Sequence, residues 1–184
     1  MPALTLVDWA KRQGPDSKQA KIVELLNQSN EILDDMVFVE GNLPTGHRTT
    51  VRTGLPSATW RLLNYGVPPS KSTTAQVTDA IGMLETYSEV DKDLANLNGQ
   101  KNEFLLSESI AFLESMNQQM AETVIYGDAT VHPQRFTGLA ARFNDMKAKN
   151  AVNIIDAGGT GSNLTSVWLV VWGENTVHNR KSTR

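Results

Sequence analysis

The residues with the clearest chemical potential form a glycine-rich loop near the end of the chain. Residues 156–163 read DAGGTGSN, and glycines that follow a strand can bring backbone N–H groups close to a phosphate. Counted from Gly159, however, Leu164 stands where a dinucleotide-binding loop has its third glycine, and the next residues are typical of a strand. The pattern therefore favours a loop that simply connects two strands. A small nucleotide-binding enzyme that uses the loop Gly158–Asn163 is the alternative.

Other residue types that carry out chemistry are scattered. The three histidines, His47, His132 and His178, are far apart and none belongs to a metal-ligand motif. The acidic segment 89–93 could bind a divalent cation, but solvated carboxylates are the simpler interpretation. The chain has no cysteine and no Gly-x-Ser-x-Gly elbow. We therefore expect no catalytic, metal-binding or cofactor-binding residue, and no enzyme activity.

The composition is that of an ordinary globular protein. The 184 residues are 40% hydrophobic and 20% charged, with a formal net charge of -3, and this length supports one domain of ordinary size. The slightly acidic balance provides no global positive field, so tight direct DNA binding is disfavoured. No signal peptide and no membrane-spanning stretch are recognisable, so we expect no membrane partner.

Charge is unevenly distributed along the chain. Residues 1–40 carry 4 basic and 7 acidic side chains, and residues 41–80 carry 4 basic side chains against one acidic side chain. Residues 81–126 carry 2 basic and 8 acidic side chains. Such runs usually reflect solubility alone, but this pattern would also allow copies of the chain to dock through complementary surfaces.

The N-terminal region is predicted to be mainly helical. Thr5 and Asp8 have the spacing of a capping box that opens a short helix. A second helix is predicted from Ser17 onwards, because apolar residues recur there at helical spacing. Residues 36–39 then favour a short strand.

A long polar hairpin is predicted between residues 41 and 90. Residues 47–53 are polar at nearly every position yet rich in β-branched types, and residues 73–90 again favour strand, with Gly82 at a bulge or bend. Glycines and prolines punctuate the segment between them. A strand without an apolar face cannot bury enough surface to offset its ordering entropy, so this ribbon should be completed by a partner.

The clearest helix is predicted at residues 107–126. Ser107 is a suitable N-cap and Gly127 a suitable stop. Apolar residues recur at spacings of three, four and seven, so this helix should be the spine of the core. The stripe is formed by Leu106, Ile110, Leu113, Met120 and Val124.

The last part of the chain is predicted to contain two strands. Residues 152–155 and 166–172 are rich in strand-forming types, and the glycine loop connects them. The tail, residues 178–184, is polar, basic and unlike a strand. The apolar residues 168–172 would then lack a covering partner, which predicts aggregation.

Several segments are more distinctive than these general patterns, both in their amino-acid sequences and in their order along the chain. They are residues 40–48 (EGNLPTGHR), 51–56 (VRTGLP), 70–77 (SKSTTAQV), 112–114 (FLE), 138–140 (GLA) and 156–163 (DAGGTGSN). Together with the order of the elements, they resemble the first half of tailed-phage and prophage major capsid proteins with the HK97-type fold. The resemblance covers about residues 1–177.

The resemblance implies an α+β, HK97-like capsid fold with an N-terminal arm, a long extended β-hairpin loop, a spine helix and an incomplete axial domain. Members of that family usually continue well past residue 172, so the axial domain is expected to be truncated. Carried over by position, the parts are an arm at 1–40, an extended loop at 41–90, a peripheral domain at 91–149 and the start of an axial domain at 150–184.

The resemblance also implies a structural major capsid protein that self-assembles into the icosahedral head enclosing phage double-stranded DNA. It would reside in the virion capsid after assembly in the host bacterial cytoplasm. Its partners would be identical subunits in hexamers and pentamers, with scaffolding, portal or decoration proteins, and packaged DNA bound only weakly or indirectly. A truncated remnant that does not assemble and a monomeric adaptor whose hairpin adds to a partner's sheet are the alternatives.

In that family the extended loop lies on a neighbouring subunit, which would explain a hairpin that lacks its own apolar face. From the charges we predict contacts between basic residues of one copy and acidic residues of the next. Single surface pairs stabilise by only about 0–1 kcal/mol, so the effect would come from repetition and would weaken with salt. The predicted residues are Arg48, Arg52, Arg61, Lys71, Glu103, Glu108, Glu114 and Glu122.

Overall fold

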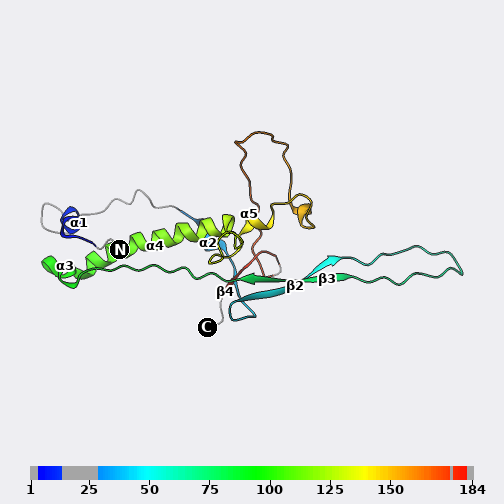
Figure 1. The fold of residues 1–184 in the computed structure, drawn as a ribbon, viewed down its shortest axis with the longest axis horizontal. Coiled ribbons are helices and arrows are strands. Elements are labelled where there is room, and N and C mark those ends of the chain that lie inside the picture. Colours follow the sequence, from blue (N-terminus) through cyan, green and yellow to red (C-terminus); the bar gives the residue numbers. More distant parts are fainter. Residues whose placement is uncertain (1–3, 14–28, 175, 182–184) are drawn as a thin grey trace. The chain divides into compact units, whose positions relative to one another are not determined.

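The computed structural model describes residues 4–13, 29–174 and 176–181. Helices and strands are both present in the described residues (Figure 1), so the α+β class predicted from the sequence is confirmed. Contacts divide the chain into two units, and we describe each by itself. Unit 1 consists of Met1–Asp34 and Met83–Glu122, and unit 2 of Asp35–Gly82 and Thr123–Arg184.

The first helix, α1 (Leu6–Lys11), begins with the predicted capping box. The Thr5 hydroxyl accepts a hydrogen bond from the Asp8 backbone N–H at 3.3 Å, and the Asp8 carboxylate accepts one from the Thr5 N–H at 3.1 Å. Hydrogen bonds from the Thr5 hydroxyl and backbone lower the pKa of Asp8. The helix predicted from Ser17 onwards lies outside the described residues. The other short helices before the long one are α2 (Glu31–Asp35), α3 (Lys92–Asn96) and η1 (Leu97–Gly99).

The long helix, α4 (Lys101–Tyr126), begins six residues earlier than the sequence predicted. Ser107 therefore lies inside the helix and is not its N-cap. Residues 101–106 (KNEFLL) are mostly good helix formers, and burial of Phe104 favours their helical state. The chain reverses just before the helix at Gly99, whose φ is +68°, so tertiary contacts and this turn set the start of the helix.

The end of α4 was predicted correctly, because the helix stops at Tyr126. The N–H of Gly127 donates to the Thr123 carbonyl at 2.9 Å, and the loop that follows returns so that the Gly138 N–H donates to the Gly127 carbonyl at 2.8 Å. A Cβ on Gly138 would lie 2.5 Å from the Thr123 oxygen. Glycine is required at this position because two backbones meet there.

The apolar stripe of α4 is only partly buried, which corrects the prediction that it forms the spine of the core. Phe104 and Val124 are buried, whereas Leu106, Ile110 and Leu113 expose 65%, 45% and 66% of their surface. The buried apolar residues of the described chain are few, and none is completely inaccessible: Met36, Ala95, Phe104 and Val124. A core this small leaves much apolar surface in contact with water.

In unit 2 the strand β1 (Phe38–Glu40) pairs in parallel with β4 (Asn179–Lys181). The tail was predicted to be unlike a strand, and for these three residues that prediction was wrong. The Asn179 N–H donates to the Val37 carbonyl at 2.8 Å, and the Asn179 side-chain amide contacts the buried Met36 sulfur at 3.1 Å. Backbone pairing across the chain thus overrides the weak strand propensity of the polar tail.

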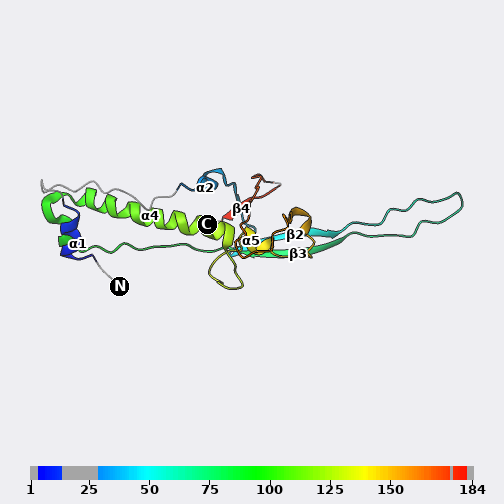
Figure 2. The same cartoon turned by 90° about the horizontal axis from the view of Figure 1, so that it is seen from above.

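The predicted hairpin is present as a two-stranded antiparallel ribbon of β2 (Gly46–Gly54) and β3 (Thr73–Ala80). Beyond the paired strands, residues 55–72 continue the hairpin as a long loop that joins β2 to β3, as Figure 1 and Figure 2 show. The strand predicted for residues 81–90 does not form, so β3 ends at Ala80. A Cβ on Gly82 would lie 3.1 Å from the Gln134 carbonyl oxygen, so this glycine permits a close backbone approach.

The two strands predicted at residues 152–155 and 166–172 do not form. Residues Ala151–Asn153 make a short turn of helix, η2, and residues 164–171 belong to no helix or strand, although Trp172 forms an isolated bridge with Val177. The short helix α5 (Leu139–Arg142) lies in the preceding loop. Apolar type alone favours strand at these positions, but a strand also needs a neighbour to pair with. Among the described residues, no helix is both long and apolar enough to cross a bilayer.

Candidate assembly surfaces

The ribbon of β2 and β3 has two different faces, because side chains alternate along each strand and directly paired residues share a face. Val51 and Val77 lie on one face, each 40% exposed, so the ribbon that was predicted to lack an apolar face has two valines on one side. We call this side the valine face and the other side the arginine face. The arginine face carries Arg48, Thr50, Arg52, Thr74, Gln76 and Thr78.

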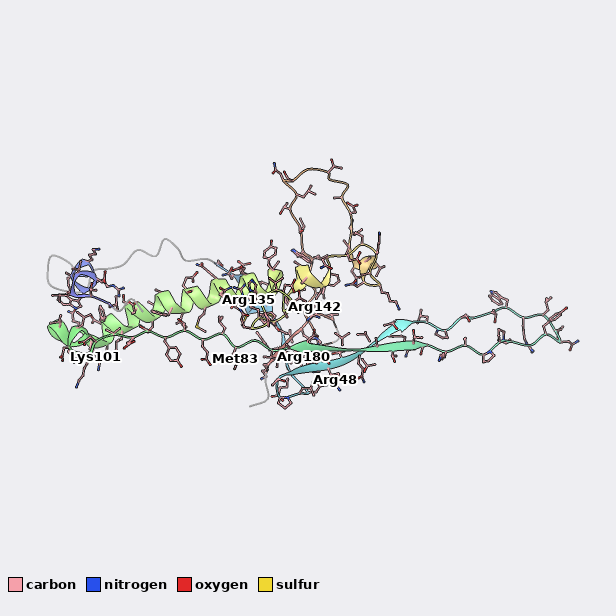
Figure 3. All side chains as sticks on the ribbon, in the orientation of Figure 1. Arg48, Met83, Lys101, Arg135, Arg142 and Arg180 are labelled. Atoms are coloured by element: carbon pink, nitrogen blue, oxygen red, sulfur yellow. The ribbon has the colours of Figure 1, made fainter. Side chains whose placement is uncertain are left out.

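The valine face is held at its root by the body of unit 2. Asp79, which shares this face, forms a salt bridge with Arg142 of α5, with 2.7 Å between Oδ1 and Nη2. At the other end of the ladder, the Lys149 ammonium donates to the Thr53 carbonyl at 2.8 Å. Figure 3 labels Arg48 and Arg142 where the ribbon meets α5. Because side chains alternate along β3, the arginine face lies opposite the face on which Asp79 meets α5.

The turn before β2 positions Arg48. The Asn42 side chain makes two hydrogen bonds to the Arg48 backbone: it donates to the carbonyl at 2.9 Å and accepts from the N–H at 2.8 Å. The Arg48 guanidinium donates to the Thr78 hydroxyl across the ribbon at 3.3 Å. Arg52 and Lys71 are exposed and have no partner among the described residues. These cations are available to an anionic surface from outside the chain.

The tip of the hairpin, residues 55–72, is exposed at every position except Ser72. Its large apolar side chains contact little of the described chain, and Trp60 is fully exposed. The exposed tip residues are Leu55, Trp60, Leu62, Leu63, Tyr65 and Val67.

The acidic residues predicted on α4 have different surroundings. Glu103 is exposed, whereas Glu108 forms an ion pair with Arg12 of the same chain. The guanidinium of Arg12 also lies over the Phe104 ring at 5.5 Å. Glu108 thus has an internal role in unit 1 that sequence reasoning missed, because residues 12 and 108 meet only in three dimensions.

The other two acidic residues accept hydrogen bonds from neighbours on α4. Gln118 donates to Glu114 at 2.7 Å, and Gln119 donates to Glu122 at 3.2 Å. Both hydrogen bonds lie within α4 and join side chains three or four residues apart.

The two units carry net charges of opposite sign. Unit 1 has 6 basic and 13 acidic residues, a net charge of 6 − 13 = −7, and unit 2 has 11 basic and 7 acidic residues, a net charge of 11 − 7 = +4. Opposite charge on two parts of one chain favours contact between different parts of two copies, which is a head-to-tail arrangement.

A group of cations and histidines gathers at the root of the ribbon. His47 at the start of β2 accepts a hydrogen bond on Nδ1 from the Asn42 N–H at 3.2 Å. Desolvation lowers the pKa of His47, and the nearby Arg180 and His178 lower it further, while Asp79 opposes them. The lowered pKa favours the neutral form of His47, whose Nδ1 can accept this bond.

The glycine loop does not have the setting of a phosphate site. Its residues are exposed, and the Gly158 N–H donates to the Asp156 carboxylate at 2.8 Å. The loop follows η2 and leads into extended chain, so it lacks the helix N-terminus that such sites use. Within the described residues, no three acidic or histidine side chains lie together as metal ligands would.

Comparison with known proteins decides the family. The family model of the major capsid protein GP7 matches residues 14–180. The chain belongs to this family of major capsid proteins. A major capsid protein is a structural component of the virion, so the predicted absence of enzyme activity is confirmed and the nucleotide-binding alternative finds no support.

A solved capsid gives the same result. The chain is similar to a chain in the near-atomic-resolution cryo-EM structure of bacteriophage Epsilon15, with 39% sequence identity and a TM-score of 0.69. The match covers 95% of this chain and 53% of that chain, so these residues span about half of the relative's length. No curated protein matches the chain. The resemblance to tailed-phage major capsid proteins is confirmed, and the fold is an α+β capsid fold.

Proposed function

We propose that this capsid protein builds a phage head by self-association, in which the hairpin of one copy contacts α4 of the next. The observation that carries the proposal is the exposed hairpin: its arginine face and tip have almost no partners among the described residues. A two-stranded ribbon is marginal in water by itself. The separation of charge between unit 1 and unit 2 supports contact with another copy.

In this proposal the protein has an HK97-like arrangement of its parts. Residues 1–40 would form an N-terminal arm, 41–90 the extended loop, 91–149 the peripheral domain and 150–184 the beginning of an axial domain.

The partners would be identical subunits in pentamers and hexamers of an icosahedral shell, with scaffolding, portal or decoration proteins. Packaged double-stranded DNA would be contacted weakly or indirectly, since the chain as a whole is acidic. Assembly would take place in the cytoplasm of the host bacterium.

The charged contacts would place Arg48, Arg52, Arg61 and Lys71 of one copy opposite Glu103, Glu114 and Glu122 of another. Glu108 would belong to the same contact together with Arg12, with which it forms an ion pair in its own chain. Pairs of this kind are individually weak and screened by salt, so repetition over the shell and steering of the encounter would be their main effects.

Sedimentation velocity and electron microscopy of the purified chain, at low and high salt, test the proposal. We expect concentration-dependent assembly that Arg48→Glu/Arg52→Glu reduces and that further Glu103→Arg/Glu114→Arg changes restore. Lys92→Glu/Lys147→Glu is the matched control, because it alters the net charge equally at exposed positions outside the ribbon. A chain that stays monomeric at all concentrations would refute self-association. Equal assembly of the ribbon variant and the control would refute the charged contact.

A further inference from the structure

The two outer edges of the ribbon are distinguished by the direction of their backbone groups. The Arg48 N–H and carbonyl both bond to the Asn42 side chain, so they point away from β3. Thr78, the residue directly opposite Arg48, therefore has its own N–H and carbonyl on the outer edge of β3. Every second residue repeats this direction, which adds Thr74 and Gln76 to that edge.

The outer edge of β2 is largely occupied. Asn42 takes the place of a neighbouring strand beside Arg48. At the other end of the strand, the Lys149 ammonium holds the Thr53 carbonyl at 2.8 Å. Between these two points Arg52 adds a second positive charge, so a second β2 at this edge would bring like charges together. The edge of β2 is therefore a poor template for another strand.

The outer edge of β3 has no such protection. Residues 73–78 (TTAQVT) are exposed and include no charged residue and no proline. The outward backbone groups of Thr74, Gln76 and Thr78 have no hydrogen-bond partner among the described residues. Proteins usually protect an edge with charge, proline or a covering element, because an open edge pairs with another strand. We infer that the edge of β3 is available for pairing.

The sequence of β3 is complementary to a second copy of itself. Two β3 strands that run antiparallel with Gln76 opposite Gln76 place Thr74 of each copy opposite Thr78 of the other. All three residues point their N–H and carbonyl groups across the new seam, so each opposite pair exchanges hydrogen bonds. Their side chains are polar and uncharged, so no like charges meet at the seam.

The valine face continues across this seam. Ala75 of one copy lies opposite Val77 of the other, and Val51 is the β2 neighbour of Ala75. A row of three apolar side chains thus crosses from one ribbon into the next. The neighbouring register, with Val77 opposite itself, would instead place Ala75 opposite Asp79, whose carboxylate is bound by Arg142. The register centred on Gln76 is favoured because it sets apolar groups opposite one another.

We propose that the outer edge of β3 pairs with the same edge of a second copy about a two-fold axis at Gln76, which joins two ribbons into one four-stranded antiparallel sheet. This deepens the proposed function and rests on it for the identity of the partner. The contact is isologous, because both copies use the same strand. One strand pair buries less than the roughly 1,200 Å² of a stable interface, so the contact is weak by itself and gains from repetition in a shell.

The two-fold pairing is compatible with the charged contact proposed above. It uses the edge of β3 and leaves the arginine face and the tip exposed. An isologous contact closes on two copies, whereas the contact between hairpin and α4 is heterologous and repeats from copy to copy. A shell can therefore use both contacts.

Cross-linking of the full chain tests which edge is used. The chain has no cysteine, so a short bismaleimide joins single-cysteine variants only at the introduced position. Gln76→Cys should give cross-linked dimers, because the two thiols face each other across the axis. Thr50→Cys is the matched control, since Thr50 is directly opposite Gln76 but on the outer edge of β2. We expect about 10-fold more dimer from Gln76→Cys, because pairing raises the effective concentration of its thiols.

Mixtures of variants test the register. Thr74→Cys mixed with Thr78→Cys should cross-link more than either variant alone, because these positions are opposite each other only between copies. Mass spectrometry of the products identifies the joined positions. Preferential joining of Gln76→Cys to Thr78→Cys would reveal the neighbouring register and overturn the one proposed.

Proline variants block each edge in turn. Proline has no N–H and is tolerated on an edge strand where the N–H points outward. Gln76→Pro and Thr50→Pro should therefore both retain the ribbon, which circular dichroism checks. Gln76→Pro should raise the dissociation constant in sedimentation equilibrium by about 10-fold or more, and Thr50→Pro should change it by less than about 2-fold. Should either proline variant unfold, the cross-linking yields decide.

The outcomes separate this contact from the proposed function. If the wild-type chain assembles but Gln76→Cys cross-links no better than Thr50→Cys, the edge pairing is refuted and self-association stands. If Gln76→Cys dimers form while Arg48→Glu/Arg52→Glu assembles like its control, the edge pairing is supported and the charged contact is refuted. A wild-type chain that stays monomeric at all concentrations refutes both.

Discussion

The guanidinium of Arg142 lies 2.7 Å from the carboxylate of Asp79 and joins α5 to the root of the ribbon on its valine face. Both side chains are about one-third exposed, so water screens the pair. The bond leaves the opposite side of the ribbon, with Arg48 and Arg52, free of α5. The position of this one salt bridge thus determines which face of the hairpin is available to another copy.

Removing this salt bridge should loosen the root of the ribbon with little effect on global stability. A double-mutant cycle of Asp79→Asn and Arg142→Met should give a coupling free energy of about 0.2–1 kcal/mol in denaturant unfolding. Amide exchange at residues 139–142 should become faster. Arg52→Met, on the arginine face, is the control and should change neither quantity. No coupling and unchanged exchange would mean that α5 is held by other contacts.

Stability should decrease in mild acid because of His47. The folded state lowers the pKa of His47 below its ordinary value of 6.5, so the unfolded chain binds the proton more readily. The free energy of unfolding should therefore fall as the pH drops below about 6.5 and level off once the folded-state pKa is passed. His47→Asn keeps an acceptor for the Asn42 N–H but cannot titrate.

Thermal unfolding between pH 8 and pH 5 measures this effect. The His47→Asn variant should show a shallower pH dependence than the wild-type chain. Identical pH profiles for wild type and His47→Asn would show that His47 does not contribute.

Gly138→Ala should destabilise the loop that closes on the end of α4. The added Cβ would lie 2.5 Å from the Thr123 carbonyl oxygen and 2.8 Å from both the Gly127 nitrogen and the Val124 oxygen. These are backbone atoms that cannot turn aside, so we expect a loss of about 1–3 kcal/mol in denaturant unfolding. Gly66→Ala is the control, because its Cβ would meet nothing within 4 Å. Equal stability of the two variants would contradict this account.

Exposed apolar residues after the glycine loop should cause aggregation of the isolated chain. Val167 and Leu169 each expose 94% of their surface and lie in extended chain without a ladder. Val167→Lys/Leu169→Lys should reduce light scattering on heating. Thr160→Lys/Thr165→Lys adds the same charge without removing apolar surface, so it should have a weaker effect. Similar scattering from both variants would attribute the improvement to net charge alone.

The features that sequence reasoning predicted correctly depend on neighbouring residues. The capping box of Thr5 and Asp8 and the end of α4 at Gly127 follow from bonds made within one turn of the chain. The hairpin was recognised from β-branched polar runs on either side of a segment rich in glycine and proline. Family membership was recognised from the breadth of the matching segments.

The errors concern segments whose state depends on a distant neighbour. β4 forms because β1, some 140 positions away, presents its backbone to the polar tail, and no local signal in residues 179–181 indicates this. Residues 167–171 have the propensity for a strand, but among the described residues only Val171 has a backbone partner there, the Val177 N–H at 3.3 Å.

Sequence alone determined the class of the protein, the hairpin and the imbalance of charge, because composition and local backbone chemistry are independent of the rest of the fold. Tertiary structure decided which surfaces face solvent. The Asp79–Arg142 bond leaves the arginine face on the side away from α5, and Leu106, Ile110 and Leu113 of α4 remain exposed. Tertiary structure also brings Arg12 to Glu108. Burial and long-range pairing require residues far apart in sequence to meet, and that information is absent from any single segment.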